Sequence, residues 1–109
     1  MRFKVVATPE FLTEAKKLAK KYSSLKSDIV GLTNQLADNP VQGTPLGKDA
    51  YKIRLAISSK GKGKSGGARV ITCVKVIAET VYLVSIYDKS AQSDIADKEL
   101  KERIRNLTK

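Results

Sequence analysis

The sequence contains no histidine and no tryptophan, and it has a single cysteine, Cys73. Without histidine, the chain lacks the side chain that most readily titrates near neutral pH and the commonest ligand of transition metals. One cysteine cannot form a disulfide within the chain, so we expect a reduced, cytoplasmic protein. The acidic residues are scattered and form no cluster typical of a two-metal nuclease. We therefore expect neither a metal ion nor another cofactor.

Long apolar runs are also absent. No stretch approaches the roughly 18 apolar residues that a membrane-spanning helix needs, and MRFKVVATPE at the N-terminus has no apolar segment of signal-peptide length. Aromatic residues make up only 6% of the chain, which leaves few platforms for stacking nucleobases. The 109 residues fit one compact domain, which we expect to span 1–109 without contact with a membrane.

Positive charge is what the sequence has in excess. The formal net charge is +10, which points to a polyanionic partner such as nucleic acid or to an acidic protein. Most of the excess positive charge lies between Lys48 and Lys75, a segment that carries a single acid, Asp49. The basic residues of this segment are Lys48, Lys52, Arg54, Lys60, Lys62, Lys64, Arg69 and Lys75.

The first half of the chain predicts a strand followed by two helices. Residues 2–7 alternate in the manner of a strand, and Thr8-Pro9-Glu10 is typical of a helix start. Apolar residues then recur at helical spacing up to Tyr22, and again from Leu25 until Asn39-Pro40 ends the pattern. Because the connection between the two patterns is short, we expect an antiparallel helical hairpin.

The second half predicts three strands and a last helix. The period changes to two from Tyr51 to Ser58, and apolar strands are expected over 68–78 and 81–87. Residues 97–107 return to a helical pattern. The expected order is β-α-α-β-β-β-α, an α+β fold in which a mainly antiparallel sheet packs against the N-terminal helical hairpin. We expect all of the helices on one face of the sheet.

A Gly- and Lys-rich stretch, SSKGKGKSGG, lies between the first two of these strands. Its Gly63-Lys64-Ser65 matches the end of the phosphate-binding loop of nucleotide-binding proteins, but that motif also needs a glycine at position 58, which is Ser58. The motif must also precede a helix, whereas an apolar strand follows here. We therefore expect no nucleotide cofactor, and a flexible basic turn remains the simpler interpretation.

Three cations flank this stretch in a pattern that suggests a phosphate site. Lys52 and Arg54 lie on the polar side of one strand, and Arg69 begins the next. If the two strands pair, the three side chains meet at one end of the sheet, where they can bind phosphate. A generic solvated sheet face is the alternative.

The segments YKIRLA (51–56), GGARVI (66–71) and VYLVSIYDKSAQSDI (81–95), in this order and spacing, resemble the RelE/HigB/ParE superfamily of bacterial toxins from type II toxin–antitoxin systems. The GKGKSGGAR insertion is similar to the HigB-like branch. The resemblance implies a RelE-like fold and a ribosome-dependent mRNA endonuclease, or mRNA interferase, that inhibits translation and arrests growth. It also implies a cognate antitoxin, the ribosome and mRNA as partners.

The resemblance further implies a set of site residues. Arg69 would contact the scissile phosphate, Arg54 would bind phosphate or stabilise charge, Lys52 would transfer a proton, and Lys89 would assist the leaving group. The expected contacts to RNA or the ribosome are Lys48, Lys60, Lys62, Lys64 and Lys75. Many RelE-like toxins also have an arginine beside the Lys89 position and a tyrosine near the C-terminus. This chain has Ser90 there and no tyrosine after Tyr87, which leaves the acid and base assignments open.

Two other functions remain open at this point. A ParE-like inhibitor of DNA gyrase would share the fold, because fold alone does not determine function. A non-catalytic module that binds RNA or DNA would have a similar excess of positive charge.

Overall fold

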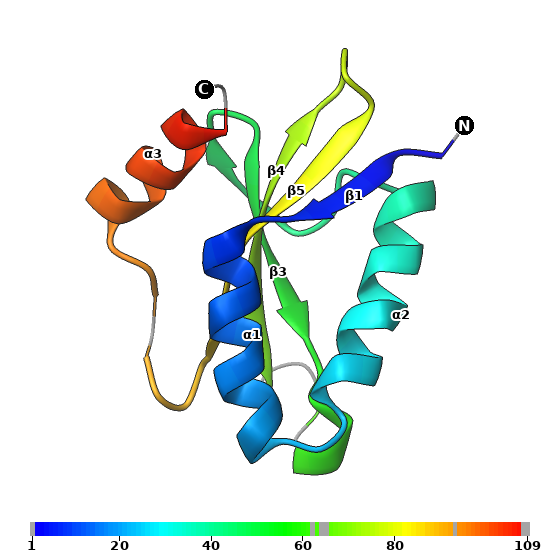
Figure 1. Cartoon of the computed structure of the whole chain (residues 1–109), viewed down its shortest axis with the longest axis vertical. Coiled ribbons are helices and arrows are strands. Elements are labelled where there is room, and N and C mark those ends of the chain that lie inside the picture. The colour runs from blue at the N-terminus through cyan, green and yellow to red at the C-terminus, as the bar shows by residue number, and fades with distance from the viewer. Residues whose placement is uncertain (1, 62, 64–65, 93, 108–109) are drawn as a thin grey trace.

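The computed structural model describes residues 2–61, 63, 66–92 and 94–107 (Figure 1). It confirms the predicted order and adds a short edge strand, β2, and one 3-10 turn, η1. The elements in chain order are β1 (Lys4–Ala7), α1 (Pro9–Lys21), α2 (Leu25–Asp38), β2 (Thr44–Gly47), β3 (Ala50–Leu55), η1 (Ser58–Lys60), β4 (Ala68–Lys75), β5 (Thr80–Asp88) and α3 (Asp97–Asn106).

The strands form one sheet in the order β1-β5-β4-β3-β2. Strands β2 to β5 pair antiparallel with their neighbours, whereas β1 runs parallel to β5. Strand β5 contains a bulge, since Ile71 pairs with Ser85 while the next residue, Thr72, pairs with Leu83. The extra residue, Val84, changes which side chains of β5 face each side of the sheet.

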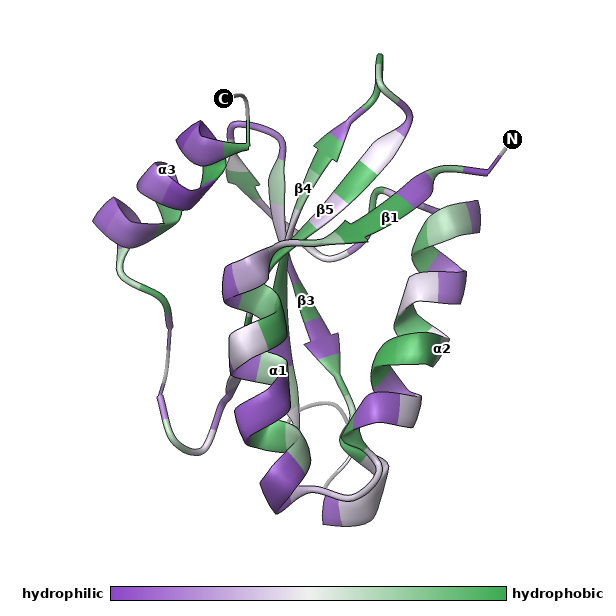
Figure 2. Cartoon of the chain, viewed as in Figure 1, coloured by the Kyte–Doolittle hydropathy of each residue, from purple (hydrophilic) through white to green (hydrophobic). Residues whose placement is uncertain are grey.

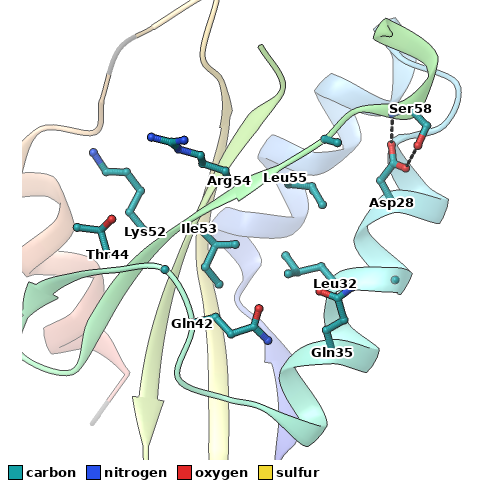
Figure 3. Close-up of a pocket in the computed structure, with 13 residues that line it drawn as sticks. Asp28, Leu32, Gln35, Gln42, Thr44, Lys52, Ile53, Arg54, Leu55 and Ser58 are labelled. Carbon is teal, nitrogen blue, oxygen red and sulfur yellow. Dashed lines mark hydrogen bonds between the residues drawn. The ribbon is translucent and has the colours of Figure 1, made fainter. Parts of the chain in front are cut away.

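Helices α1 and α2 cover one face of the sheet. Helix α1 begins at Pro9 because Thr8 caps it, with its hydroxyl accepting a hydrogen bond of 3.3 Å from the Phe11 N–H. Phe11 and Leu25 are buried in the core between the hairpin and the sheet. From β3, Ile53 joins this core on the side of α2, while the side chains of Lys52 and Arg54 point away from it (Figure 3).

The prediction that all helices lie on one face is wrong for α3. Leu100 of α3 is buried in a second core with Ile71, Cys73, Val84 and Tyr87, whose side chains point away from the helical hairpin. The physical reason is visible in β4 and β5, which are buried along nearly their whole length and therefore need cover on both faces. Helix α3 provides this cover with few apolar residues and is mostly hydrophilic (Figure 2).

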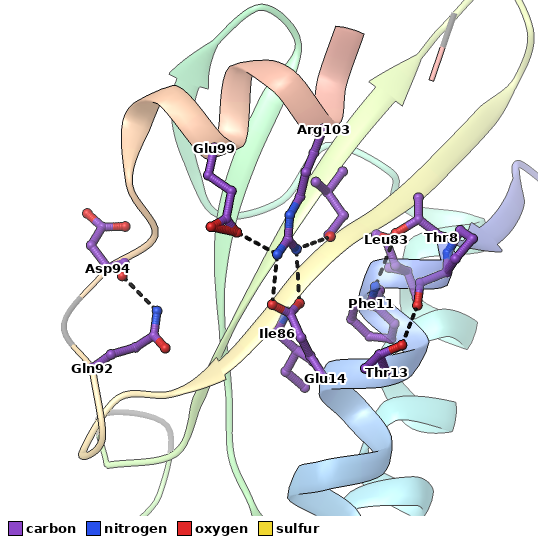
Figure 4. Close-up of polar contacts among 12 residues, drawn as sticks. Thr8, Phe11, Thr13, Glu14, Leu83, Ile86, Gln92, Asp94, Glu99 and Arg103 are labelled. Carbon is purple, nitrogen blue, oxygen red and sulfur yellow. Dashed lines mark hydrogen bonds and ion pairs between the residues drawn. The ribbon is translucent and has the colours of Figure 1, made fainter. Parts of the chain in front are cut away.

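An ion pair joins α3 to α1 along the open edge of β5. Arg103 donates to both carboxylate oxygens of Glu14 at 3.0 Å and to the Val84 carbonyl at 3.0 Å, while Glu14 accepts from the Ile86 N–H at 3.2 Å (Figure 4). Hydrogen bonding to Glu14 raises the pKa of Arg103. Because β1 pairs with β5 only as far as Leu83, these side chains satisfy backbone groups that would otherwise form an exposed strand edge.

A second polar network fixes the end of β5. Asp88 is 3% exposed and accepts hydrogen bonds from Tyr22 at 2.6 Å, from Lys60 at 2.9 Å and from the Ser90 hydroxyl at 2.7 Å. Burial opposes ionisation of Asp88, but these hydrogen bonds outweigh it and hold the pKa of the carboxyl well below its usual range. The network ties α1, η1 and the end of β5 together beside the basic residues.

Replacement of Arg103 by methionine should destabilise the protein by about 2 kcal/mol, because Glu14 and the Val84 carbonyl lose a charged donor. Urea unfolding measures the effect. The matched control is Lys101→Met, which removes an exposed ion pair with Asp97 and should change stability by less than about 0.5 kcal/mol. Equal effects of the two substitutions would contradict the role given to the edge contact.

The Asp88 network predicts a specific dependence of stability on pH. Because the folded-state pKa of Asp88 is lowered, its stabilising effect is present above the unfolded pKa of about 4 and is lost as the pH falls toward the folded value. Urea unfolding of the wild type and of Asp88→Asn should therefore show the largest difference above pH 5 and a shrinking one below pH ~4. A difference that stays constant down to the acid limit would contradict this account.

Candidate nucleic-acid site

The face of β3 opposite the helical hairpin carries the predicted cations. Arg54 of β3 pairs directly with Arg69 of β4, and Lys52 pairs with Ile71. Residues opposite each other in an antiparallel pair project from the same face. The structure thus brings Lys52, Arg54 and Arg69 together at one end of the sheet.

Tyr87 of β5 extends this row and was missed by the sequence reasoning. It pairs with Arg69, is 5% exposed, and packs in the second core on the side of α3. Simple alternation from Leu83 would place Tyr87 on the hairpin side, but the bulge at Val84 reverses the sides. Burial, together with the nearby Asp94, raises the pKa of Tyr87 to about 12, so its hydroxyl remains a donor at neutral pH.

Asp94 places a carboxylate on this basic face, another feature that the sequence did not reveal. It accepts a hydrogen bond of 3.1 Å from Lys52, one of 3.2 Å from the Tyr87 hydroxyl and one of 2.9 Å from the Ile95 N–H. Partial burial disfavours its ionisation, but the hydrogen bond from Lys52 and the contacts beside it lower the pKa of Asp94. The site therefore contains its own anion in this structure.

The cations lie at different depths. Arg54 is exposed, the side chain of Lys52 is 25% exposed, and Arg69 is only 5% exposed. Arg69 donates a hydrogen bond of 3.1 Å to the carbonyl of Ala68. An incoming ligand would thus meet Arg54 first, and would contact Arg69 directly only after it had become more exposed.

Lys89 and Lys60 lie at the same end of the sheet. Lys89 is exposed, and its backbone N–H donates to the Gly67 carbonyl at 3.2 Å, next to the turn into β4. Lys60 differs from the freely docking lysine that we expected, because its side chain is 11% exposed and pairs with Asp88. The hydrogen bond to Asp88 raises the pKa of Lys60, so this lysine holds the fold together at the rim of the site.

The remaining predicted contacts do not join this group. Lys75 ends β4, six residues after Arg69, which corresponds to about 20 Å along a strand. Lys48 lies in the turn between β2 and β3, and its carbonyl is 3.9 Å from the Cys73 sulfur, also toward the far end of the sheet. Lys62 and Lys64 fall outside the described residues.

The composition of the site limits its chemistry. Within 2–61, 63, 66–92 and 94–107, no three His, Cys, Asp or Glu residues group in a way that could hold a metal ion. Over the same ranges, no helix combines the length and apolar character needed to cross a membrane. What the site offers is a row of cations, a buried tyrosine hydroxyl and one carboxylate, which suits binding of a phosphodiester and transfer of protons.

Comparison with known proteins gives a consistent result. The chain matches the family described as "RelE toxin of RelE / RelB toxin-antitoxin system" over residues 3–109. A mutant of the E. coli toxin RelE in its free state is similar in structure, with a TM-score of 0.66, 19% identity and 98% of each chain covered.

Two further structures share the fold. The intact E. coli RelBE toxin–antitoxin complex matches with a TM-score of 0.61 and 20% identity, covering 79% of this chain and 95% of the other. A metal-bound toxin from Helicobacter pylori matches with a TM-score of 0.52 and 18% identity, covering 82% and 97%. At these identities the structures support the fold, while the match over nearly the whole chain shows the family. This chain belongs to the RelE toxin family of toxin–antitoxin systems.

Proposed function

We propose that this RelE-family toxin is an mRNA endonuclease that acts on the ribosome and arrests translation. The observation that carries the proposal is the row formed by Arg54, Arg69 and Tyr87 across β3, β4 and β5, with Lys52 beside it. These groups can bind and cleave a phosphodiester without histidine. The proposed reaction needs no metal ion or cofactor.

The proposed reaction is an attack by the ribose 2′-hydroxyl on the adjacent phosphate. A bond forms from the 2′ oxygen to phosphorus, and the bond from phosphorus to the 5′ oxygen breaks, giving a 2′,3′-cyclic phosphate and a 5′-hydroxyl. The pentacoordinate transition state carries extra negative charge. Cations held in place by the fold therefore stabilise it more than they stabilise the bound substrate.

The position of each residue suggests its role in this reaction. Arg54 is exposed, and its guanidinium can contact two phosphate oxygens at once. The neighbouring Arg69, which is buried, adds positive charge to the site. Lys52 donates to the Asp94 carboxylate, and this pair can take up the proton that the attacking 2′-hydroxyl releases. We assign assistance to the leaving 5′ oxygen to Lys89, which is exposed at the same end of the sheet.

Lys48 and Lys75 belong to a different part of the surface. They lie toward the far end of the sheet, so the proposal gives them contacts with RNA or the ribosome beyond the scissile phosphate. Such contacts contribute affinity that falls with salt concentration.

The proposal includes a cognate antitoxin as the second partner. The RelBE complex with the same fold contains both a toxin and an antitoxin. A chain with a net charge of +10 favours an acidic segment in the partner that covers its basic face. The ribosome and mRNA place the proposed activity in the cytoplasm.

The test compares wild type with Arg54→Ala and Arg69→Ala after induction in cells. Both substitutions should abolish growth arrest and reduce mRNA cleavage about 100-fold or more, a loss typical of removing a group that stabilises charge in the transition state. Primer extension on cellular mRNA measures the cleavage. Lys98→Ala, in exposed α3, is the control and should cleave like the wild type.

We expect Arg54→Ala to fold normally, because the Arg54 side chain is exposed whereas that of Arg69 is buried. A loss of cleavage in Arg54→Ala would therefore report on the site and not on misfolding. Circular dichroism establishes that each variant is folded. Undiminished cleavage by Arg54→Ala would contradict the proposal. A DNA-damage response without mRNA fragments from the wild type would show a gyrase inhibitor instead.

A further inference from the structure

The turn between β4 and β5 is apolar and projects from the sheet. The Glu79 N–H donates to the Val76 carbonyl at 3.0 Å, so Ile77 and Ala78 are the central residues of a β-turn. Ile77 is fully exposed and Val76 is mostly exposed. The hairpin extends beyond the ends of the neighbouring strands at the top of the molecule (Figure 1). We call residues 76–79 the tip.

Packing within the described part of the chain does not explain the apolar character of the tip. Central turn residues are usually glycine, asparagine, aspartate or proline, because these residues fit the backbone of a turn. Neither the turn nor the core gains from the Ile77 side chain, since it is fully exposed. Adjacent exposed apolar side chains on a projecting element are instead typical of a contact with another molecule.

The groove between α1 and α2 is a second apolar feature that is open to solvent. It has a volume of about 530 Å³. Its lining includes the buried Phe11 and Leu83 and the exposed Leu12 of α1 and Val30 of α2. Figure 1 shows that the two helices diverge from their short connection. Their facing sides therefore leave apolar surface uncovered.

The charges of the tip and the groove are opposite. Among the described residues that line the groove, only Lys16 and Lys26 are charged, and both are exposed. Neither lysine forms an ion pair within the described part of the chain. The tip carries one charged residue, Glu79. A convex apolar tip with one acid is thus complementary to a concave apolar groove with two bases.

A second copy of the chain is the occupant that this complementarity favours. The tip belongs to a closed β-turn, so it cannot fold back onto the groove of its own chain. Every copy carries one tip and one groove. A contact between these unlike surfaces is heterologous, and it leaves a free tip and a free groove to which further copies can add.

We propose that copies of this chain associate head to tail, with the tip of one copy inserted into the α1–α2 groove of the next. Ile77 enters the groove, and Glu79 approaches Lys16 or Lys26. The small contact and the net charge of +10 keep the association weak. The cations of β3 lie on the opposite face of the sheet from the helical hairpin, so the phosphate site stays open in such an assembly.

Sedimentation velocity of the full chain measures the association, at concentrations up to about 1 mM because a small interface binds weakly. The wild type should form oligomers that grow with concentration. Ile77→Asn removes the side chain that enters the groove and should weaken the association at least about tenfold. Val41→Asn, which changes another exposed valine outside the tip and the groove, is the control and should associate like the wild type.

A second pair of variants tests the groove. Val30→Glu puts a carboxylate into the groove and should also weaken the association at least about tenfold. Asn34→Glu, exposed on α2 outside the groove, makes the same change in charge and should have no effect.

A mixture of the two defective variants tests whether the tip binds the groove. Ile77→Asn keeps an intact groove and Val30→Glu keeps an intact tip. An equimolar mixture should therefore form a one-to-one complex, although each variant alone stays monomeric. The complex should grow no further, because the tip and the groove that remain free in it are the altered ones.

A wild type that stays monomeric at every concentration would overturn the proposal and leave the groove to a different protein. A mixture of the two variants that stays monomeric would overturn it as well. Loss of association in Ile77→Asn but not in Val30→Glu would show two tips packed on each other and would also contradict it. None of these measurements involves RNA, so failure of the nuclease proposal would leave the results unaffected.

Discussion

The cations on one face of β3 and β4 repel one another, and the rest of the structure at this end of the sheet must offset that repulsion. Arg54 and Arg69 are direct cross-strand neighbours, and like charges in that position destabilise a sheet. Two carboxylates offset this charge. Asp94 binds Lys52 on the basic face, and Asp88 binds Lys60 at its rim. The fold thus maintains a concentrated positive site by supplying anions from the chain itself.

The two exposed strand edges of the sheet are treated differently. Beyond β1, the edge of β5 is closed by Glu14 and Arg103, which hydrogen-bond to its backbone. Beyond β2, the edge of β3 stays open next to Arg54. Closing the edge of β5 prevents unspecific strand pairing there.

The sequence predicted the elements that have clear local signals. The cap at Thr8, the change of period at Tyr51 and the pairing that joins Arg54 to Arg69 follow from adjacent residues. The bulge at Val84 has no such signal, and alternation alone would place Tyr87 on the wrong side of the sheet. Asp94 lies seven residues after Tyr87 in an irregular segment, and nothing in its local pattern indicates that it reaches Lys52.

The position of α3 could not be predicted for a similar reason. Its apolar stripe showed that it packs on something, but the continuous apolar runs of β4 and β5 do not tell which face needs cover. The ion pair of Lys60 with Asp88 could not be predicted either, because it depends on the burial of Asp88 in the assembled fold.

The central claim is that the basic face binds RNA phosphate at the place where Asp94 now neutralises Lys52. Its most direct test is the affinity of a non-cleavable RNA, with a 2′-deoxy sugar at the scissile position, for the wild type and Asp94→Asn. Removing the internal anion should tighten binding about threefold to tenfold at low salt, since one opposing charge leaves the site. Unchanged or weaker binding by Asp94→Asn would contradict the account.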